Sequence, residues 1–474
     1  MASIKDVLKG SLTYSVVPIC TALLTLFVVP FVSYVYPTDE YGKINLFYTV
    51  GSLGMSIFLL GFDYFFMRNY YDYDEGRSPK VLFTLALAVG IGVDVVASVA
   101  VFLFFRGAAS KVLFGRDDPA SLLMLAVYIA CLIAFRLLNT MARMRGNAAR
   151  FNVQSVMQNV ITRASFVLIA WYSTSYQWAL LVMTLGMALV TAVFMFRQRS
   201  ECLQLVSRST AGPLVKAGWL FGVPCMLDAM ATQLNSSIGK IVLSGYGMFD
   251  AVGVLAIATT LSTAFSMIPQ AFGTYWAPFM YKNYKTEQRL IRNMHDLVMV
   301  LSIALAVGIY ALQDVLFLLV GQSYKTGQAI FMLLMLVPVQ SLICETTNYG
   351  IMLENKPVYG TAATACGVAL CAVLTICLVP SLEVNAVGIA VGLSAVVTGV
   401  MRSVIGCRFY RSVNSWGRTA VGSALIIAVC ASNFFVYQSL PARLLISGVV
   451  LAITCLLYRR QLAYGLERLK GSRT

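Results

Sequence analysis

The chain has 474 residues, of which 59% are hydrophobic and only 12% are charged. Soluble domains carry about 25% charged residues, so this composition excludes a water-soluble protein and most soluble enzyme classes. Lys and Arg total 35 against 20 Asp and Glu, a net charge of +15, and in a membrane protein the useful question is where these cations lie relative to the bilayer.

Segments of about 20 mostly apolar residues, the length that crosses a bilayer, recur along the whole sequence. Fourteen are predicted, at 12–36, 42–66, 81–105, 120–141, 153–174, 178–197, 213–239, 250–274, 294–318, 328–350, 358–379, 385–407, 419–437 and 441–459. Residues 380–385 separate the eleventh segment from the twelfth. The first apolar run is too long for a cleavable signal peptide, and no small-residue cleavage site follows it. The sequence therefore predicts an all-α polytopic membrane protein.

The basic residues predict the orientation of these segments. An even number of spans places both termini on one side of the membrane. With the N-terminus in the cytoplasm, 25 of the 35 Lys and Arg residues fall in inner segments and seven in outer ones, with the loop 106–119 as the one discordant place. Cytoplasmic loops are enriched in Lys and Arg, so we expect cytoplasmic N- and C-termini.

Four weak matches indicate an internal duplication. The sequence reads Asp39-Glu40-Tyr41-Gly42 before the second span and Asp250-Ala251-Val252-Gly253 before the eighth. Pro18 matches Pro224, Met67-Arg68-Asn69-Tyr70 matches Tyr281-Lys282-Asn283-Tyr284, and Asn139 matches Asn348. The offsets stay between 206 and 214, and six spans separate the copies, so both copies have the same orientation. Parallel repeats are a transporter architecture with the substrate path between the halves.

The repeat divides the chain into three predicted parts. Residues 1–200 form an N-terminal six-helix lobe, residues 213–408 form a C-terminal six-helix lobe, and residues 419–474 form two extra helices and a basic tail. Several spans of the first half and the start of the second carry polar faces, and the last two spans carry almost none. We therefore expect a water-filled cavity lined by spans 1–12, with the last two helices peripheral.

Ionisable residues inside spans are costly in hydrocarbon and usually face a cavity or a partner. Six such residues are interpreted as facing a cavity: Arg136, Arg163, Asp94, Asp228, Glu345 and Arg402. Two alternatives without a role in transport stay open. Arg136 and Glu345 occupy matching places in the repeat and would lock the halves together as an ion pair. Asp63 and Arg68 lie near a span end and would form a solvated pair.

Motifs of catalysis or metal binding are absent from the sequence. There is no Walker A pattern, and no HExxH, CxxC or GxSxG motif with a partner. The eleven cysteines have no metal-ligand spacing, and the lone histidine, His295, is interpreted as an interfacial polar residue at the start of a span. We expect no enzyme, no metal and no cofactor.

Four segments resemble the polysaccharide biosynthesis (Wzx-type) flippases of the multidrug/oligosaccharidyl-lipid/polysaccharide exporter superfamily. They are PTDEYGKINLF at 37–47, GFDYFFMRNYY at 61–71, LNSSIGKIVLS at 234–244 and YWAPFMYKNYK at 275–285. The resemblance implies that the protein moves an undecaprenyl-diphosphate-linked oligosaccharide, the repeat unit of an O-antigen, capsule or exopolysaccharide, from the cytoplasmic to the periplasmic leaflet of the bacterial inner membrane. It implies two six-helix lobes in a V around a cationic lumen, and polysaccharide polymerase and chain-length machinery as partners.

One departure from the family pattern is visible. The family commonly has an acidic residue followed by Arg or Lys at the end of the seventh span, where this chain has Gly239-Lys240. A proton- or cation-coupling role of that acid therefore does not carry over, and Asp228 is the nearest replacement.

The resulting hypothesis is transport by alternating access with coupling to H⁺ or Na⁺. Arginine suits a diphosphate because it donates hydrogen bonds in a bidentate fork. The candidate lumen residues are Arg136, Arg163, Arg68, Lys240, Asn235, Asp228, Glu345 and Arg402, and the coupling candidates are Asp63, Asp94 and Asp228.

Two related functions remain open from the sequence. A lipid II (peptidoglycan precursor) flippase shares the fourteen-span layout and a cationic cavity. A cation-coupled multidrug exporter usually has twelve spans and an acidic lumen, which the arginines within spans disfavour. A membrane polymerase or acyltransferase would need a sizeable outer loop or a catalytic histidine, whereas all the predicted loops are short and His295 lies at an inner helix end.

Overall fold

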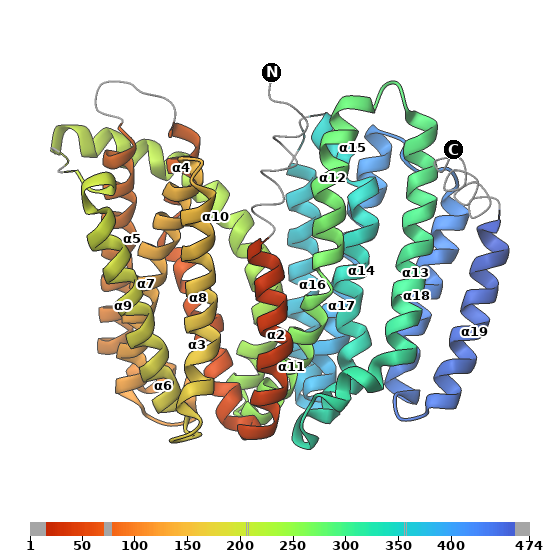
Figure 1. Ribbon diagram of the computed structural model, residues 1–474, viewed down its shortest axis with the longest axis horizontal. Helices are drawn as coiled ribbons and strands as arrows, with labels where there is room; N and C mark the ends of the chain where they lie inside the picture. The colour runs from red at the N-terminus through yellow and green to blue at the C-terminus, as the bar shows by residue number, and fades with distance from the viewer. Residues whose placement is uncertain are drawn as a thin grey trace. The chain divides into compact units, whose positions relative to one another are not determined.

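The computed structural model describes residues 16–70, 78–204, 206, 208–354, 356 and 358–459, together with most of their side chains. This part of the chain forms helices and turns and contains no β-strand. It divides into two compact units, residues Met1–Gly253 and Val254–Thr474, and each is described by itself (Figure 1). Residues 1–15 and the predicted basic tail from residue 460 lie outside the described residues.

The first unit contains nine described helices and the start of a tenth. They are α2 Val16–Val35, α3 Thr38–Phe58, α4 Phe62–Asn69, α5 Pro79–Phe104, α6 Arg106–Phe114, α7 Pro119–Met144, α8 Ala148–Ile169, α9 Tyr176–Cys202, α10 Arg208–Gly245 and the first residues of α11 Phe249–Ala264. Helix α7 is the core of this unit and packs against α3, α5, α8 and α9. Its side chains at Tyr128, Ile133, Phe135 and Leu137 are fully buried.

The second unit continues α11 and is built around α14. Its other helices are α12 Met267–Asn283, α13 Gln288–Leu318, the 3-10 turn η1 Gln322–Gly327, α14 Gln328–Thr347, α15 Tyr349–Leu353, α16 Val358–Leu382, α17 Val384–Phe409, α18 Trp416–Val436 and α19 Leu440–Leu457. Helix α14 packs against α12, α13, α17 and α18. The predicted separation of two spans within residues 380–385 is confirmed, because α16 ends at Leu382 and α17 begins at Val384.

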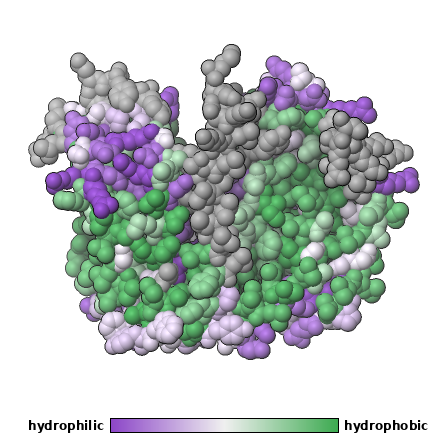
Figure 2. All heavy atoms as spheres, in the orientation of Figure 1, coloured by the Kyte–Doolittle hydropathy of each residue, from purple (hydrophilic) through white to green (hydrophobic). Residues whose placement is uncertain are grey.

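Ten of these helices are long and apolar enough to cross a membrane, or eleven if the bent pair α3 and α4 is one span, among the residues that were described. The protein is therefore a multi-pass membrane protein. Within the described residues, the fourteen predicted segments fall mainly on single helices or on consecutive helices, but the count of fourteen spans stays a prediction. Hydrophobic side chains cover the middle of each unit and hydrophilic ones gather at its two ends (Figure 2).

The ends of the helices follow ordinary capping chemistry. Ser78 caps α5 and Asp118 caps α7, each accepting a hydrogen bond from the backbone N–H three residues later, and each is followed by a proline in the first turn. Proline is favoured there because the N–H that it lacks has no partner in the first turn. Helices α5 and α7 therefore begin where the sequence provides both a cap and a proline.

The division between the units lies later in the chain than the predicted lobe boundary. The sequence repeat placed residues from 213 onward in the C-terminal lobe, whereas α10 packs on α3, α4 and α6 and so belongs to the first compact unit. The sequence matches indicate which segments resemble each other. The compact units instead reflect which helices bury surface against each other. The assignment of six helices to each lobe stays a prediction.

Two glycines that the repeat matches, Gly42 and Gly253, lie at one crossing of α3 and α11 within the first unit. A Cβ on Gly42 would lie 2.1 Å from the carbonyl oxygen of Phe249, and a Cβ on Gly253 would lie 2.1 Å from that of Thr38. The side chains of Thr38 and Asp250 hydrogen-bond beside the crossing. Only glycine allows two backbones to approach this closely.

Polar contacts attach the last two helices to the second unit. Arg443 at the start of α19 is fully buried, pairs with Asp314 and donates to the carbonyl oxygen of Tyr310 at 3.1 Å. Asn433 of α18 is also fully buried and accepts a hydrogen bond from Gln313. These buried contacts were not visible in the sequence, which indicated almost no polar face on the last two spans, because a few buried polar residues do not alter the average hydropathy of a span.

The discordant loop 106–119 contains its own acidic partners. Arg106 pairs with Asp117 at 3.3 Å and Arg116 lies 3.9 Å from Asp118. Asp118 is 5% exposed and accepts hydrogen bonds from Tyr176 Oη (2.6 Å), Gln177 Nε2 (2.6 Å) and Ser121 (3.1 Å from N, 2.9 Å from Oγ). Burial alone would raise the pKa of Asp118, but these hydrogen bonds outweigh it and hold the pKa below its ordinary value.

The depressed pKa predicts a pH-dependent stability. The unfolded carboxyl has a pKa of about 3.9, so Asp118 stabilises the fold above that pH and its contribution is lost as pH falls through the lower folded value. We expect Asp118→Asn to lower the free energy of unfolding at neutral pH by about 1–3 kcal/mol and the difference from the native protein to shrink below about pH 4. Thermal unfolding of purified protein at several pH values measures this. The exposed neighbour variant Asp117→Asn is the control, and an equal effect of the two substitutions would contradict the prediction.

Candidate functional site

The predicted lumen residue Arg136 forms an ion pair within the first unit. Its Nε and Nη2 both donate to Oδ2 of Asp63, at 3.1 and 3.0 Å. The carboxylate of Asp63 is buried, with the residue 4% exposed, whereas 42% of the Arg136 side chain remains exposed. Arg136 therefore neutralises a buried acid through the Nε and Nη2 edge of its guanidinium, and its side chain is otherwise partly exposed.

The local backbone explains how Asp63 reaches this place. Helices α3 and α4 meet at a 54° bend, and Gly61 at the start of α4 has a φ of +72°, which favours glycine. A side chain at Gly61 would collide with the backbone of Gly222, because its Cβ would lie 2.0 Å from the carbonyl oxygen. The bend places Asp63 in the first turn of α4, where the helix dipole favours a negative charge.

The structure gives Asp63 a partner that the sequence did not suggest. Within the first unit, Asp63 of α4 pairs with Arg136 of α7, while a pair between Arg136 and Glu345, which would join the two units, stays a prediction. Asp63 is buried against that arginine, so the expectation that it is solvated near a span end is wrong. An acid with a fixed counter-ion is a weaker candidate for coupling than the sequence indicated.

The other basic candidates of the first unit lie on three different helices. Arg163 on α8 lies close enough to Tyr41 of α3 for its charge to act on the phenol. Lys240 on α10 is partly buried and donates to Thr49 Oγ1 of α3 at 3.4 Å, and no ion pair joins it to an acid in the described part of the chain. Arg68 is exposed near the end of α4. The first unit thus holds four of the five cations among the candidate lumen residues, and the fifth, Arg402, belongs to the second unit.

The remaining polar candidates of this unit differ in burial. Asp94 on α5 is 2% exposed, and its Oδ1 accepts a hydrogen bond from Ser98 Oγ at 3.3 Å. Among the described residues no cation pairs with it. Asn235 on α10 is half-buried. The side chain of Asp228, predicted to line the lumen and to couple transport, lies outside the described residues.

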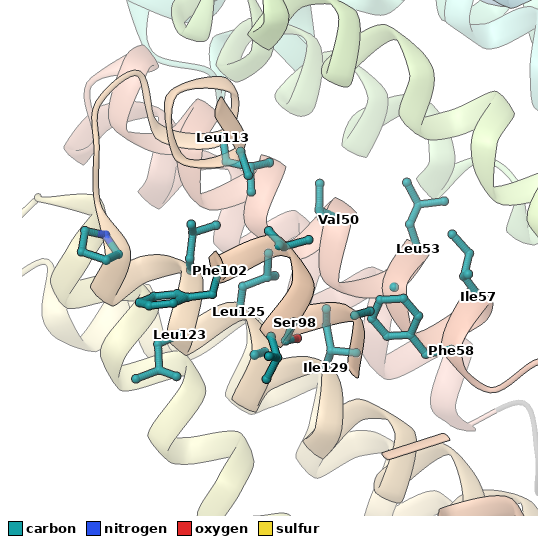
Figure 3. A pocket seen from close by; sticks show the side chains of 18 of the residues that line it. Val50, Leu53, Ile57, Phe58, Ser98, Phe102, Leu113, Leu123, Leu125 and Ile129 are labelled. Carbon is teal, nitrogen blue, oxygen red and sulfur yellow. The ribbon is translucent and has the colours of Figure 1, made fainter. Parts of the chain in front are cut away.

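A cavity of about 900 Å³ in the first unit is lined in part by Ser98, the hydrogen-bond partner of Asp94. Its walls come from α3, α5, α6 and α7, with Ile241 from α10 (Figure 3). Leu53, Phe58, Phe102 and Ile129 are typical of the lining, and Ser98 contributes a hydroxyl. None of the lining residues is charged, so this cavity is not the cationic lumen that the sequence predicts.

The second unit holds the last two candidates. Arg402 on α17 donates through Nη2 to Thr364 Oγ1 of α16 at 2.6 Å, and its Nε is buried without a hydrogen-bond partner. Glu345 on α14 is half-buried and accepts a hydrogen bond from Tyr349 Oη at 3.4 Å. No ion pair involving either residue is found within the described ranges.

His295 is a buried residue rather than an interfacial one. It is fully buried in α13, with Nδ1 2.8 Å from Thr346 Oγ1 of α14 and Nε2 3.1 Å from Thr419 Oγ1 of α18. Its position near the predicted end of a span suggested contact with water, and the sequence carried no signal that two threonines on other helices would cover it. In the part of the chain described, no cluster of three His, Cys, Asp or Glu side chains is arranged to hold a metal ion.

The fold resembles solved transporters over nearly its whole length. A lipid II flippase, MurJ in an inward closed conformation, superposes with a TM-score of 0.70 at 12% identity, covering 95% of this chain and 99% of that one. The MATE multidrug transporter DinF-BH gives 0.58 at 17% identity, covering 86% and 96%. An inward-facing MATE family transporter of the MOP superfamily gives 0.57 at 14% identity, covering 87% and 99%.

These likenesses establish the fold alone, because every identity is low. No family model matches the sequence, and no curated protein matches it either. The chain thus has the all-helical fold of membrane flippases and MATE exporters, and its substrate has to be argued from its own residues.

Proposed function

We propose that the protein is a flippase that moves an undecaprenyl-diphosphate-linked oligosaccharide from the cytoplasmic to the periplasmic leaflet of the bacterial inner membrane by alternating access. The fold shared with MurJ and the MATE transporters supports a flippase or exporter. The local sequence resemblance to Wzx-type flippases supports the oligosaccharide. The termini lie in the cytoplasm in this proposal, as the distribution of Lys and Arg favours.

The half-paired guanidinium of Arg136 is the observation that carries the proposal. An arginine inside a bilayer normally has its charge fully compensated or faces water. Arg136 uses one edge for Asp63 and leaves 42% of its side chain exposed. A diphosphate matches the remaining donors, because a guanidinium binds phosphate oxygens as a planar fork.

The proposed cycle uses the other cations of the first unit as secondary contacts. Arg163, Lys240 and Arg68 steer or hold the diphosphate beside Arg136, the lipid tail stays in the bilayer, and the glycan occupies a polar cavity. Residues 1–200 and 213–408 form the rocking lobes in this scheme, with 419–474 attached to the second. Asp94, buried and without a cation among the described residues, is the coupling candidate of the first unit.

Lipid II is the second candidate substrate, because MurJ superposes with a higher TM-score than the MATE transporters quoted beside it. Lipid II also carries a diphosphate, so the charge arrangement suits both substrates. A multidrug exporter is the third candidate from the MATE likeness, but an exposed arginine is a poor contact for a cationic drug.

Deletion and complementation distinguish the three substrates. We expect a deletion strain to lose surface glycan and to accumulate undecaprenyl-diphosphate glycan on the cytoplasmic leaflet, measured by leaflet-resolved quantification of lipid-linked intermediates. Re-expression of the protein should reverse both changes, and Arg163→Ala at normal protein level should reverse them only in part. Lysis with normal surface glycan would transfer the assignment to lipid II. A change in drug sensitivity alone would overturn the lipid-linked substrate.

A further inference from the structure

The two units contain one equivalent polar position, which the duplication links. The repeat matches Arg136 on α7 with Glu345 on α14, and Asn139 with Asn348 one helical turn later. Each of the two helices is the core of its unit. The Oδ1 atoms of Asn139 and Asn348 are both buried without a hydrogen-bond partner. Each unit therefore has a charged residue at this position and, three residues later, an asparagine whose buried side-chain oxygen has no hydrogen-bond partner.

The halves differ in what lies opposite the charged residue. In the first unit Asp63 of α4 contacts Arg136. In the second unit the residue against Glu345 is Gly273 of α12, which follows Asp63 at nearly the same repeat offset, and a Cβ on it would lie 2.7 Å from Oε2 and 3.2 Å from Oε1. A charged partner is thus present in the first unit, while in the second a bare glycine backbone covers one face of a carboxylate.

The surroundings of Glu345 offer it no fixed cation in the described part of the second unit. From α15 the phenol of Tyr349 donates at 3.4 Å, and from α12 Tyr281 packs edge-on against Tyr349. Arg402 of α17 donates to Thr364 instead. On α13, His295 is held by Thr346 and Thr419.

Two other charged residues on the packed helices pair with each other. Arg418 of α18 pairs with Asp296 of α13 at 3.5 Å, and Asp296 also accepts a hydrogen bond from Asn414 at 2.9 Å. A half-buried carboxylate without a counter-ion is costly inside a membrane protein and is relieved by neutralisation.

We propose that Glu345 is a proton-binding carboxylate of the second unit. Its Oε takes a proton from water, and the resulting O–H donates to an oxygen on the same helical face, with the unsatisfied Oδ1 of Asn348 three residues later as the acceptor. A metal ion needs several oxygen ligands, whereas this place offers one phenol and one amide oxygen beside the carboxylate. The first unit thus keeps an ion pair for an anion, and the second keeps an unpaired acid that exchanges a proton.

Infrared spectroscopy of the purified full-length protein tests this without any substrate. The band of protonated carboxylic acids is followed from about pH 5 to about pH 9, the range of a shifted carboxyl. We expect Glu345→Gln to remove one titrating carboxyl from the difference spectrum. The matched control Glu354→Gln changes an exposed carboxylate of the same unit and should leave that titration unchanged.

Two further variants keep the test decisive if Glu345→Gln folds poorly. Gly273→Ala retains the carboxylate but places a Cβ against it, so the titrating carboxyl band should shift in position without disappearing. Asn348→Ala removes the acceptor, so the midpoint should move to lower pH. Titrations identical to the native protein in all three variants would overturn the proposal, as would a band that responds to Na⁺ in place of pH.

A coupling role for this proton rests on the proposed function. It is tested by a separate experiment, whose failure can be told apart from a failure of the proton site. In cells, Glu345→Gln should reduce surface glycan at normal protein level, while Glu354→Gln should not. A titrating Glu345 with unchanged glycan would leave the proton site standing and remove its link to the flippase. A missing titration would remove the proton site and leave the flippase proposal untouched.

Discussion

Arg136→Gln is expected to lower the free energy of unfolding by about 2–3 kcal/mol and to abolish glycan export. Removing one partner of a buried ion pair costs about 3–5 kcal/mol because the other charge stays buried and unpaired. The cost is placed below that range because 42% of the Arg136 side chain is exposed, although Asp63 is only 4% exposed. Thermal unfolding in detergent and surface glycan in the complemented deletion strain measure the two effects.

A double variant separates stability from transport. Asp63→Asn with Arg136→Gln replaces the pair by two amides and should recover most of the lost stability, because no buried charge is left alone. It should not recover export, because the diphosphate still lacks its guanidinium. Arg143→Gln is the matched control on α7, since Arg143 is exposed. Recovery of export by the double variant would show that the pair is structural and would refute the substrate role of Arg136.

The second large effect is expected at the crossing of α3 and α11. Gly253→Val places a Cβ 2.1 Å from the carbonyl oxygen of Thr38. The atoms that it meets belong to the backbone, so no flexible side chain can move aside to relieve the clash. Overpacking of this kind costs about 1–3 kcal/mol or more, so the two helices should separate and export should be lost. The substitution Thr38→Cys reports the separation, because a membrane-impermeant maleimide should label the thiol faster when Gly253→Val is also present.

The control for this crossing is a glycine of the same unit that lies in open space. Gly92 on α5 has no atom within 4 Å of a built Cβ, so Gly92→Val should change neither the labelling nor export. Gly42→Val should reproduce the effect of Gly253→Val, because its Cβ meets the carbonyl oxygen of Phe249 at the same distance. Wild-type labelling and export in both crossing variants would contradict the close approach of these helices.

The repeat motif around Gly42 and Gly253 illustrates how much sequence pattern alone predicted. Apolar segments of about 20 residues specify helices locally, and the break near residue 383 was visible because a proline and polar residues interrupt the run. The match between 39–42 and 250–253 anticipated equivalent helix starts. It did not predict that these two glycines touch, since contact depends on how helices distant in sequence pack.

Among the candidate residues, the sequence identified Arg136, Glu345 and Arg402 as costly intramembrane charges but did not identify their partners. Asp63 seemed to be near water because it lies at a span end, and only the bend at Gly61 turns it into the core. His295 and Arg443 are buried by residues that are distant in the sequence. Threonines and carbonyl oxygens of this kind are too common for their spacing to be informative.

The sequence by itself determined that this is an all-helical membrane protein, while the alternation of basic loops and the internal repeat that it indicates stay predictions. Hydrophobicity and span length are local properties, so they can be read along the chain. Only the tertiary structure decided that Arg136 is half paired and that Glu345 faces a glycine. The free energy of a charge depends on what lies within a few ångströms of it, and those neighbours come from distant segments of the chain.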